Sequence, residues 1–173
     1  MAELDLVMLS NEIFIYSALL LKLFNQSVDE RLQSLGVPMS SLQLSILRML
    51  QHETLTVSTI SERLGMDPST IVRTVDALER KSLAVRGVDP DDRRRNPIEI
   101  SQEGLELIHK VPVVTETDHS FQALQSIGIE SVLQLRELLL KVIKEFPEGK
   151  LVSELMSGMP GPEIESKDEP CKQ

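Results

Sequence analysis

The chain has 173 residues, of which 41% are hydrophobic and 26% are charged, as is typical of a single soluble globular domain. Its net charge of −9 excludes binding to nucleic acid through the whole surface, because the phosphate backbone would repel such a protein. Its one cysteine, Cys171, excludes an internal disulfide and a cysteine zinc site, and its three histidines lack a metal-binding spacing, so we expect no metal and no cofactor.

The N-terminal segment predicts one long helix. Residues 4–35 contain neither proline nor glycine, and apolar side chains recur at every third or fourth position. A second helix is expected after Ser40 or Ser41, either of which can cap it. We expect no apolar run of the roughly 20 residues that a bilayer span requires, and the acidic start is unlike a signal peptide. These features favour a cytoplasmic protein with no membrane partner.

A pair of short helices is predicted next. Thr56 is expected to cap a helix over 57–64, and Gly65 would end it in a left-handed conformation. Asp67 is a favourable N-cap and Pro68 fits the first helical position, so a further helix is expected to run to about residue 81. A connection this short between two helices is typical of a helix-turn-helix.

The second helix of this pair is the candidate DNA reader. The N-terminal half of such a helix meets base edges in the major groove, where an arginine can bind guanine through two hydrogen bonds. The alternative is that the polar side of this helix is an ordinary solvent-exposed face. The short helix before it and the predicted hairpin after it make that alternative less favoured. The helix would bury Ile71, Val75 and Leu78 and present Ser69, Thr70, Arg73 and Thr74.

After Leu83 the apolar pattern changes from helical to alternating, which predicts a β-hairpin ending near residue 100. Its loop holds three consecutive arginines, more than Asp91 and Asp92 can neutralise. We expect Arg94 to enter a narrow minor groove and Asp92 to brace a neighbouring arginine. The alternative is a solubilising turn whose charges pair internally. A hairpin in this position predicts the wing of a winged helix.

The C-terminal part of the chain predicts two further helical segments and a tail. A helix that opens at Ser101 is expected to break at Pro112, and residues 129–146 form a final amphipathic helix. Residues 147–173 are rich in Pro, Gly, Glu and Ser and are expected to be a flexible acidic tail. The first and last helical segments carry more apolar side chains than one winged helix can bury, which predicts a dimer.

Four segments of the sequence resemble the MarR family of transcriptional regulators. Asp89-Pro90-Asp91-Asp92-Arg93-Arg94 and Ile98-Glu99-Ile100-Ser101-Gln102-Glu103-Gly104 resemble the family's wing and the residues after it. Leu64-Gly65-Met66-Asp67-Pro68-Ser69-Thr70 and Val75-Asp76-Ala77-Leu78-Glu79-Arg80-Lys81 resemble its recognition element. The match covers about residues 5–146. It departs at Ser82, where glycine is usual, at Ser101, which replaces threonine, and at Pro112, which interrupts a normally continuous helix.

The resemblance implies a mainly α fold, a winged helix-turn-helix of three helices and a β-hairpin wing, with N- and C-terminal helices forming a dimerisation region. The domain would span residues 1–146, with its DNA-binding lobe at about 40–100 and its dimerisation helices at about 4–35 and 101–146. It would act as a homodimer on a pseudo-palindromic operator in double-stranded DNA, as a repressor that a small-molecule effector could release. The expected DNA-binding residues are Ser40, Pro68, Ser69, Thr70, Arg73, Thr74, Arg86, Arg93, Arg94 and Arg95, with Asp92 bracing the wing; effector-binding residues stay unassigned.

Two other classes of function fit these motifs less well. An enzyme is not expected, because the sequence has no phosphate loop, nucleophile elbow or metal motif. A winged helix that binds proteins and not DNA is the stronger alternative, since the fold alone does not guarantee DNA binding.

Overall fold

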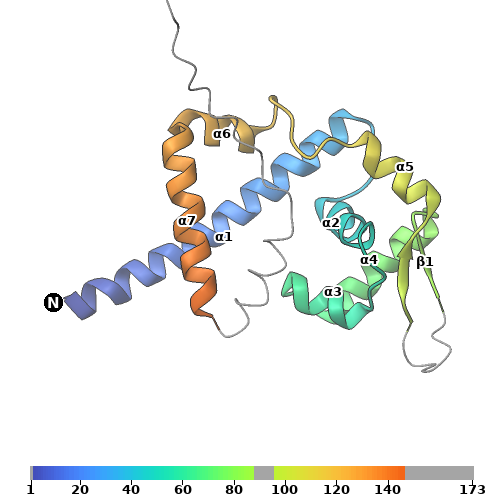
Figure 1. The fold of residues 1–173 in the computed structure, drawn as a ribbon, viewed down its shortest axis with the longest axis horizontal. Helices are drawn as coiled ribbons and strands as arrows, with labels where there is room; N and C mark the ends of the chain where they lie inside the picture. Colours follow the sequence, from blue (N-terminus) through green and yellow to red (C-terminus); the bar gives the residue numbers. More distant parts are fainter. Residues whose placement is uncertain (1, 88–95, 147–173) are drawn as a thin grey trace, which may run out of the picture. The chain divides into compact units, whose positions relative to one another are not determined.

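The computed structural model describes residues 2–87 and 96–146. The chain divides into two compact units, Met1–Ala123 and Leu124–Gln173. The described elements are α1 (Ala2–Ser34), α2 (Ser41–Leu50), α3 (Val57–Leu64), α4 (Pro68–Arg80), β1 (Ala84–Arg86), β2 (Ile98–Ile100), α5 (Gln102–Lys110), α6 (His119–Ile127) and α7 (Ile129–Glu145) (Figure 1).

This order of elements confirms the mainly α winged-helix fold that the sequence predicts. α3 ends at Gly65, whose φ of 59° is the left-handed conformation that glycine adopts without strain. Asp67 caps α4, and Pro68 occupies its first turn. α3 therefore ends, and α4 begins, at residues whose local chemistry favours a helix terminus.

One described helix, α6, is not predicted by the sequence pattern. α5 ends at Lys110, next to the break expected at Pro112, and residues 111–118 connect it to α6. Gly128, with a φ of 79°, separates α6 from α7. The C-terminal region thus holds one more helix than the periodicity indicates.

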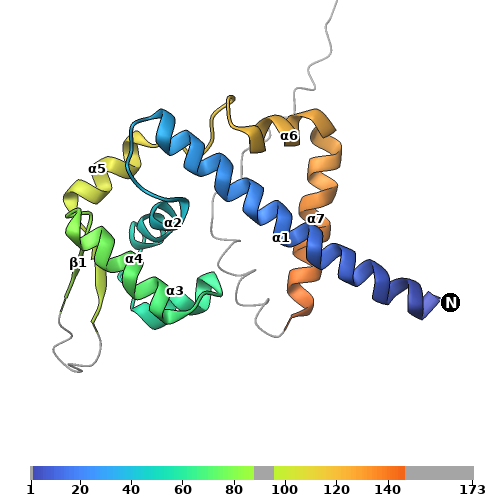
Figure 2. The ribbon, with the colours of Figure 1, turned by 180° about the vertical axis from the view of Figure 1, so that it is seen from behind.

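The hydrophobic core of the first unit lies where α2, α3, α4 and β2 meet. Ile71, Val75 and Leu78 are fully buried there, which confirms the predicted inner face of α4. Leu32 is also fully buried and joins the C-terminal end of α1 to this core. Figure 2 shows this end of α1 beside α2, with which it makes direct contacts. This core therefore holds α3 and α4 in place.

Two hydrogen bonds attach the hairpin to the segment just before α3. β1 and β2 are antiparallel, with Ala84 opposite Ile100 and Arg86 opposite Ile98. The Ile98 amide donates to the Leu55 carbonyl at 2.7 Å, and the Leu55 amide donates back to Ile98 at 3.1 Å. Because Leu55 precedes α3 directly, this bridge holds the base of the hairpin against the start of the helix pair.

Ser101 and Gly104 hold α5 against the hairpin. The Ser101 hydroxyl accepts a hydrogen bond from the Gly104 amide at 2.9 Å and donates to the Ser82 carbonyl at 2.6 Å. A Cβ atom on Gly104 would overlap the Leu83 carbonyl oxygen, so only glycine permits this approach. Ser82 has a φ of 59°, a left-handed conformation that disfavours side chains. The Ser-x-x-Gly spacing is therefore a packing requirement at this joint.

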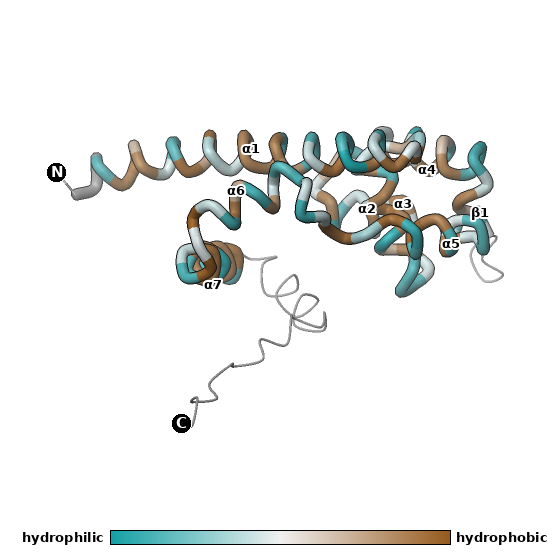
Figure 3. Tube along the Cα trace, turned by 90° about the horizontal axis from the view of Figure 1, so that it is seen from above, coloured by the Kyte–Doolittle hydropathy of each residue, from teal (hydrophilic) through white to brown (hydrophobic). Residues whose placement is uncertain are grey.

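The N-terminal part of α1 is apolar and exposed. Figure 3 shows hydrophobic residues recurring along its length, interrupted by hydrophilic ones. A window within Asp5–Ser34 has a mean hydropathy of 1.6. By length and composition alone this helix could cross a membrane, so the expectation that the chain has no apolar run of that length is wrong. Glu12 and Lys22 interrupt that run. In the second unit, α7 also exposes the apolar side chains of Ile129, Leu138, Leu139 and Val142, and Phe146, just after the helix, is exposed as well.

Candidate nucleic-acid interface

The outer face of α4 carries the polar residues that the sequence assigns to DNA reading. Pro68, Ser69 and Arg73 are exposed, whereas Thr70 and Thr74 are half-buried. Ser69 and Arg73 lie opposite the core face of the helix, the two threonines flank that face, and all five residues fall within the first two turns. The structure therefore brings these five residues together on one solvent-facing surface, the α4 reading face.

Asp67 organises the start of this face. Its carboxylate accepts a hydrogen bond from the Ser69 amide at 2.8 Å. Hydrogen bonds from the side chain and amide of Ser69 hold the pKa of Asp67 below its usual value, and the positive charge of Arg73 contributes further. Asp67 is consequently ionised at neutral pH, and it fixes the direction in which the helix begins.

The Thr74 hydroxyl of the reading face is engaged within α4, as the Ser69 hydroxyl is engaged with Asp67. The Thr74 hydroxyl donates to the Thr70 carbonyl at 2.8 Å, which is a bond within the helix. A hydroxyl whose proton is used in this way still has lone pairs that accept hydrogen bonds. Thr74 can therefore meet a base amino group, but a phosphate oxygen offers it no donor.

Arg86, the last residue of β1, forms ion pairs with α4. Its Nη2 is 2.7 Å from Asp76 Oδ1 and its Nη1 is 2.8 Å from Glu79 Oε2. Its backbone amide also donates to Glu79 Oε1 at 3.2 Å. The sequence assigns Arg86 to DNA, whereas the structure engages its charge with two carboxylates of the reader helix. This arrangement ties the first strand of the wing to α4.

Ser40 lies at the N-cap of α2. Its hydroxyl accepts from the Gln43 amide at 3.3 Å, while the Gln43 side chain accepts from the Ser40 amide at 3.2 Å. Lys81, just after α4, donates to the same Gln43 oxygen at 3.1 Å. The predicted DNA contact at Ser40 is therefore part of a joint between the start of α2 and the end of α4.

The remaining predicted site residues lie outside the described residues. They are the three wing arginines, with the aspartate expected to brace them: Arg93, Arg94, Arg95 and Asp92. Within residues 2–87 and 96–146, no cluster of three or more His, Cys, Asp or Glu side chains has the geometry of a metal site.

Sequence reasoning missed the residues that hold this surface together. Asp76 and Glu79 are three positions apart, a spacing that places two side chains on one side of a helix. The sequence therefore shows that the two carboxylates lie together, but it does not show their partner, because Arg86 lies in a strand and not in the same helix. Lys81 gave no signal, because its partners lie about forty positions earlier in the chain.

The comparisons with known proteins agree with this geometry. A model of the MarR family matches residues 35–95. A transcriptional regulator of the MarR family from Rhodococcus sp. RHA1 is 26% identical, with a TM-score of 0.65 over 78% of this chain and 94% of that one. MepR from S. aureus, solved as a DNA complex, is 25% identical, with a TM-score of 0.61 over 77% and 96%. CouR from Rhodococcus jostii RHA1, solved with p-coumaroyl-CoA, is 26% identical, with a TM-score of 0.57 over 78% and 93%.

Proposed function

We propose that this winged-helix chain, whose residues 35–95 match a model of the MarR family, is a transcriptional regulator that binds a specific operator in double-stranded DNA as a homodimer. One observation carries the proposal. The α4 reading face lies on the exposed side of a helix whose other side is locked into the core, directly before a β-hairpin. This is the arrangement in which a recognition helix enters the major groove while a wing reaches the adjacent groove.

Arg73 is the residue that we assign to base reading. It is exposed one turn into α4, and no ion pair holds it among the described residues. Ser69 and Thr70 lie at the positive end of the helix, where hydroxyls and amides suit a phosphate. Pro68 shapes this end and Thr74 accepts from base donors. MepR, solved as a DNA complex, supports DNA as the ligand that we propose for this chain.

The wing supplies the second contact in this proposal. Arg86 anchors its first strand to α4 through Asp76 and Glu79, so the hairpin would approach DNA in a fixed direction relative to the reader. Arg93, Arg94 and Arg95 follow in the loop, and we assign Arg94 to the minor groove, where an arginine meets concentrated negative potential. Asp92 would brace a neighbouring arginine.

A second copy of the chain is the partner that we propose for the exposed apolar residues of α1. Leu6, Leu9, Ile13 and Tyr16 recur at helical spacing and are more than half exposed. A monomer that displays such a continuous apolar surface is poorly soluble, and burial against an identical helix removes it from water. Glu12 and Lys22 disfavour a bilayer as the alternative partner, since a charge near the middle of a membrane helix costs about 2.5–3.5 kcal/mol.

The domain boundaries follow from this assignment. We propose residues 1–146 as the functional domain, with residues 147–173 as a tail outside it. Regulators of this family are generally not enzymes and are typically cytoplasmic, and we propose both for this chain. We further propose that it represses transcription and that a small molecule releases it; the solved complex of CouR with p-coumaroyl-CoA supports an effector.

Selection of bound duplexes from a random DNA library tests the proposal. The full chain is expected to enrich a pseudo-palindrome whose half-sites are about one helical turn, ~10 base pairs, apart. The variant Arg73→Ala is the matched control, because it keeps the fold and should enrich a more degenerate site. If the wild-type chain enriches no sequence over the starting library, the proposal is wrong and the interpretation as a protein-binding winged helix is favoured.

A further inference from the structure

Lys81, the residue directly after α4, is bound to the start of α2. Its Nζ donates to the Pro38 carbonyl oxygen and, at 3.1 Å, to Oε1 of Gln43. A cation is favoured at this end of a helix, where the last carbonyl groups carry partial negative charge. We call these contacts of Lys81 with Pro38 and Gln43 the α2–α4 joint. The joint holds the end of the reader helix to a segment about forty positions earlier in the chain.

The same end of α2 is bound to α1. The Asp29 carboxylate of α1 accepts a hydrogen bond from the amide of Ser41, the first residue of α2. The capping box of Ser40 and Gln43 holds the Gln43 oxygen to which Lys81 donates. Figure 2 shows α2 between α1 and α4, and α2 contacts both helices. A continuous series of polar contacts therefore runs from α1, through the start of α2, to the end of α4.

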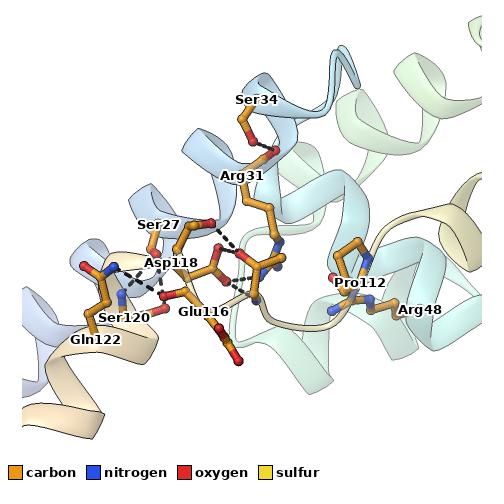
Figure 4. Close-up of polar contacts among 11 residues, drawn as sticks. Ser27, Arg31, Ser34, Arg48, Pro112, Glu116, Asp118, Ser120 and Gln122 are labelled. Atoms are coloured by element: carbon orange, nitrogen blue, oxygen red, sulfur yellow. Dashed lines mark hydrogen bonds and ion pairs between the residues drawn. The ribbon is translucent and has the colours of Figure 1, made fainter.

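The C-terminal end of α1 is itself fixed. Arg31, in its last turn, is buried and donates to the buried carboxylate of Asp118, which lies between α5 and α6. Arg48 of α2 donates to the Pro112 carbonyl of the same connection at 3.1 Å. Figure 4 shows Arg31 reaching toward Asp118 and Arg48 beside Pro112. The end of α1 is therefore a firm base from which α2 and α4 are positioned.

The core beneath α4 constrains the depth of this helix more than its direction. Its buried residues are all apolar, and hydrophobic burial is not directional, so it resists a small pivot less than a hydrogen bond does. The reading face occupies the first two turns, at the end of α4 opposite to Lys81. A helix of 13 residues is about 20 Å long, so a pivot of about 10° at one end moves the other by about 3 Å. That displacement is close to the rise of one base pair, about 3.4 Å.

The exposure of Lys81 separates an effect on position from an effect on stability. Water competes for its hydrogen bonds, so they add little to the free energy of folding. Arg80, its neighbour, is also exposed, and no hydrogen bond or ion pair engages its side chain within residues 2–87 and 96–146. The two adjacent cations therefore share a charge but differ in their bonds, which makes Arg80 a matched control.

We propose that Lys81 is a positioning residue, which through the α2–α4 joint sets the direction of α4 relative to α1 and thereby the spacing of half-sites that the dimer accepts. The inference rests on the proposed function for its meaning in DNA binding. The direction of α4 itself is measurable without DNA.

The first test measures that direction by double electron–electron resonance in the full chain without DNA. Spin labels are attached at Gln33→Cys on α1 and Ser69→Cys on α4, both exposed positions, in a chain that also carries Cys171→Ser. Labelled chains are diluted with unlabelled ones, so that distances within one chain dominate. Lys81→Met, which keeps the length of the side chain but no donor, is expected to broaden the distance distribution by about 3 Å. Lys81→Arg, which keeps the donors, and Arg80→Met, which removes a charge alone, should leave it unchanged.

The second test measures affinity for the selected operator and for the same duplex with one base pair inserted between its half-sites. The insertion moves one half-site by about 3.4 Å and turns it by about 34°. The wild type is expected to bind the inserted duplex at least tenfold more weakly, and Lys81→Met no more than threefold more weakly. Lys81→Arg should restore the wild-type ratio, and Arg80→Met should not change it. A variant that is merely less stable binds both duplexes more weakly and keeps the ratio.

Three results would overturn the proposal. A distance distribution of Lys81→Met that matches the wild type would mean that the α2–α4 joint does not hold the reader helix. An unchanged ratio, with the slope of log K against log salt reduced by about one, would make Lys81 a phosphate contact. A ratio that Arg80→Met narrows as much would mean that charge alone matters. If Lys81→Met does not fold, Gln43→Met removes the acceptor from the opposite side and is measured in its place. A broadened distribution in a chain that enriches no operator would keep the joint and reject the proposed regulator, so the two failures are distinguishable.

Discussion

The Nη2 atom of Arg86 lies 2.7 Å from Oδ1 of Asp76, and this contact joins β1 to α4, the helix to which we assign DNA reading. Glu79 completes the joint from the next turn of the same helix. The arginine side chain is less than one-third exposed, so solvent screens these pairs less than it screens a surface ion pair. The distance and direction between reader and wing are therefore set partly by charge.

Arg86→Ala is expected to weaken operator binding without changing its salt dependence. A residue that positions the wing alters how well the protein fits DNA, whereas a residue that touches phosphate releases a counterion. Removal of a phosphate contact reduces the slope of log K against log salt by about one. Titrations by fluorescence anisotropy at several salt concentrations separate the two roles. A slope reduced by one unit would show that Arg86 contacts phosphate and that its pairs open on binding.

Arg73→Ala is expected to relax sequence choice more than it lowers general affinity. A bidentate contact from arginine to guanine is worth about 1–3 kcal/mol of discrimination against other bases. Affinities for the operator and for single-base variants measure this loss. Arg80→Ala is a matched control, since Arg80 is exposed on the same helix but in its last turn, and its loss should leave base preference intact. Equal weakening on every duplex would instead make Arg73 a phosphate contact.

Asp118→Asn is expected to destabilise the protein by about 3–5 kcal/mol at neutral pH, because it leaves Arg31 as a buried charge without its partner. Burial opposes ionisation of Asp118, but hydrogen bonds from Thr115 and the charge of Arg31 hold its pKa below the usual value. A lowered pKa contributes stability that is present above the unfolded value, about 3.9, and is lost as the pH falls through the folded value.

Urea unfolding between pH 7 and pH 3 measures both effects. The stability of the wild type should fall more steeply below about pH 4 than that of Asp118→Asn, which has no such carboxylate. Glu30→Gln, which changes an exposed carboxylate nearby, should alter stability by no more than about 0.5 kcal/mol. Parallel acid limbs for Asp118→Asn and the wild type would contradict the assigned role of the Arg31 pair.

Gly104→Ala is expected to destabilise the first unit by about 1–3 kcal/mol, a typical cost of overpacking. The added methyl group would overlap the Leu83 carbonyl, a backbone atom that cannot rotate away. Thermal unfolding monitored by circular dichroism measures the change. Gly36→Ala is a useful comparison, because it meets no neighbouring atom and its cost reflects only its left-handed backbone. Unchanged stability of Gly104→Ala would show that α5 moves away freely.

Features set by neighbouring residues could be predicted from the sequence. Gly65, Asp67 and Pro68 determine the ends of α3 and α4 through local conformation and capping, and the structure confirms both ends. The core face of α4 follows from its helical period in the same way. The reading face is the outer side of that helix, so its location was predictable although its contacts with DNA remain predictions.

Features that depend on contacts between different elements of the fold could not be predicted from the sequence. Arg31 and Asp118 are 87 positions apart, and no sequence motif near either residue predicts their ion pair. Arg86 carries the charge expected of a DNA contact, yet two carboxylates on another element engage it. The length of the apolar run in α1 was underestimated, because Glu12 and Lys22 interrupt it without lowering its mean hydropathy enough.

The mass of the complex between the full chain and its selected operator tests the central claim most directly. In the proposed function, the exposed apolar residues of α1 pair two chains, and each chain places its single reading face on one half-site of the duplex. Sedimentation equilibrium with a labelled duplex of the selected sequence should therefore give two chains per duplex at saturation and a dimer without DNA. One chain per duplex, together with a stable monomer at micromolar concentration, would contradict the account.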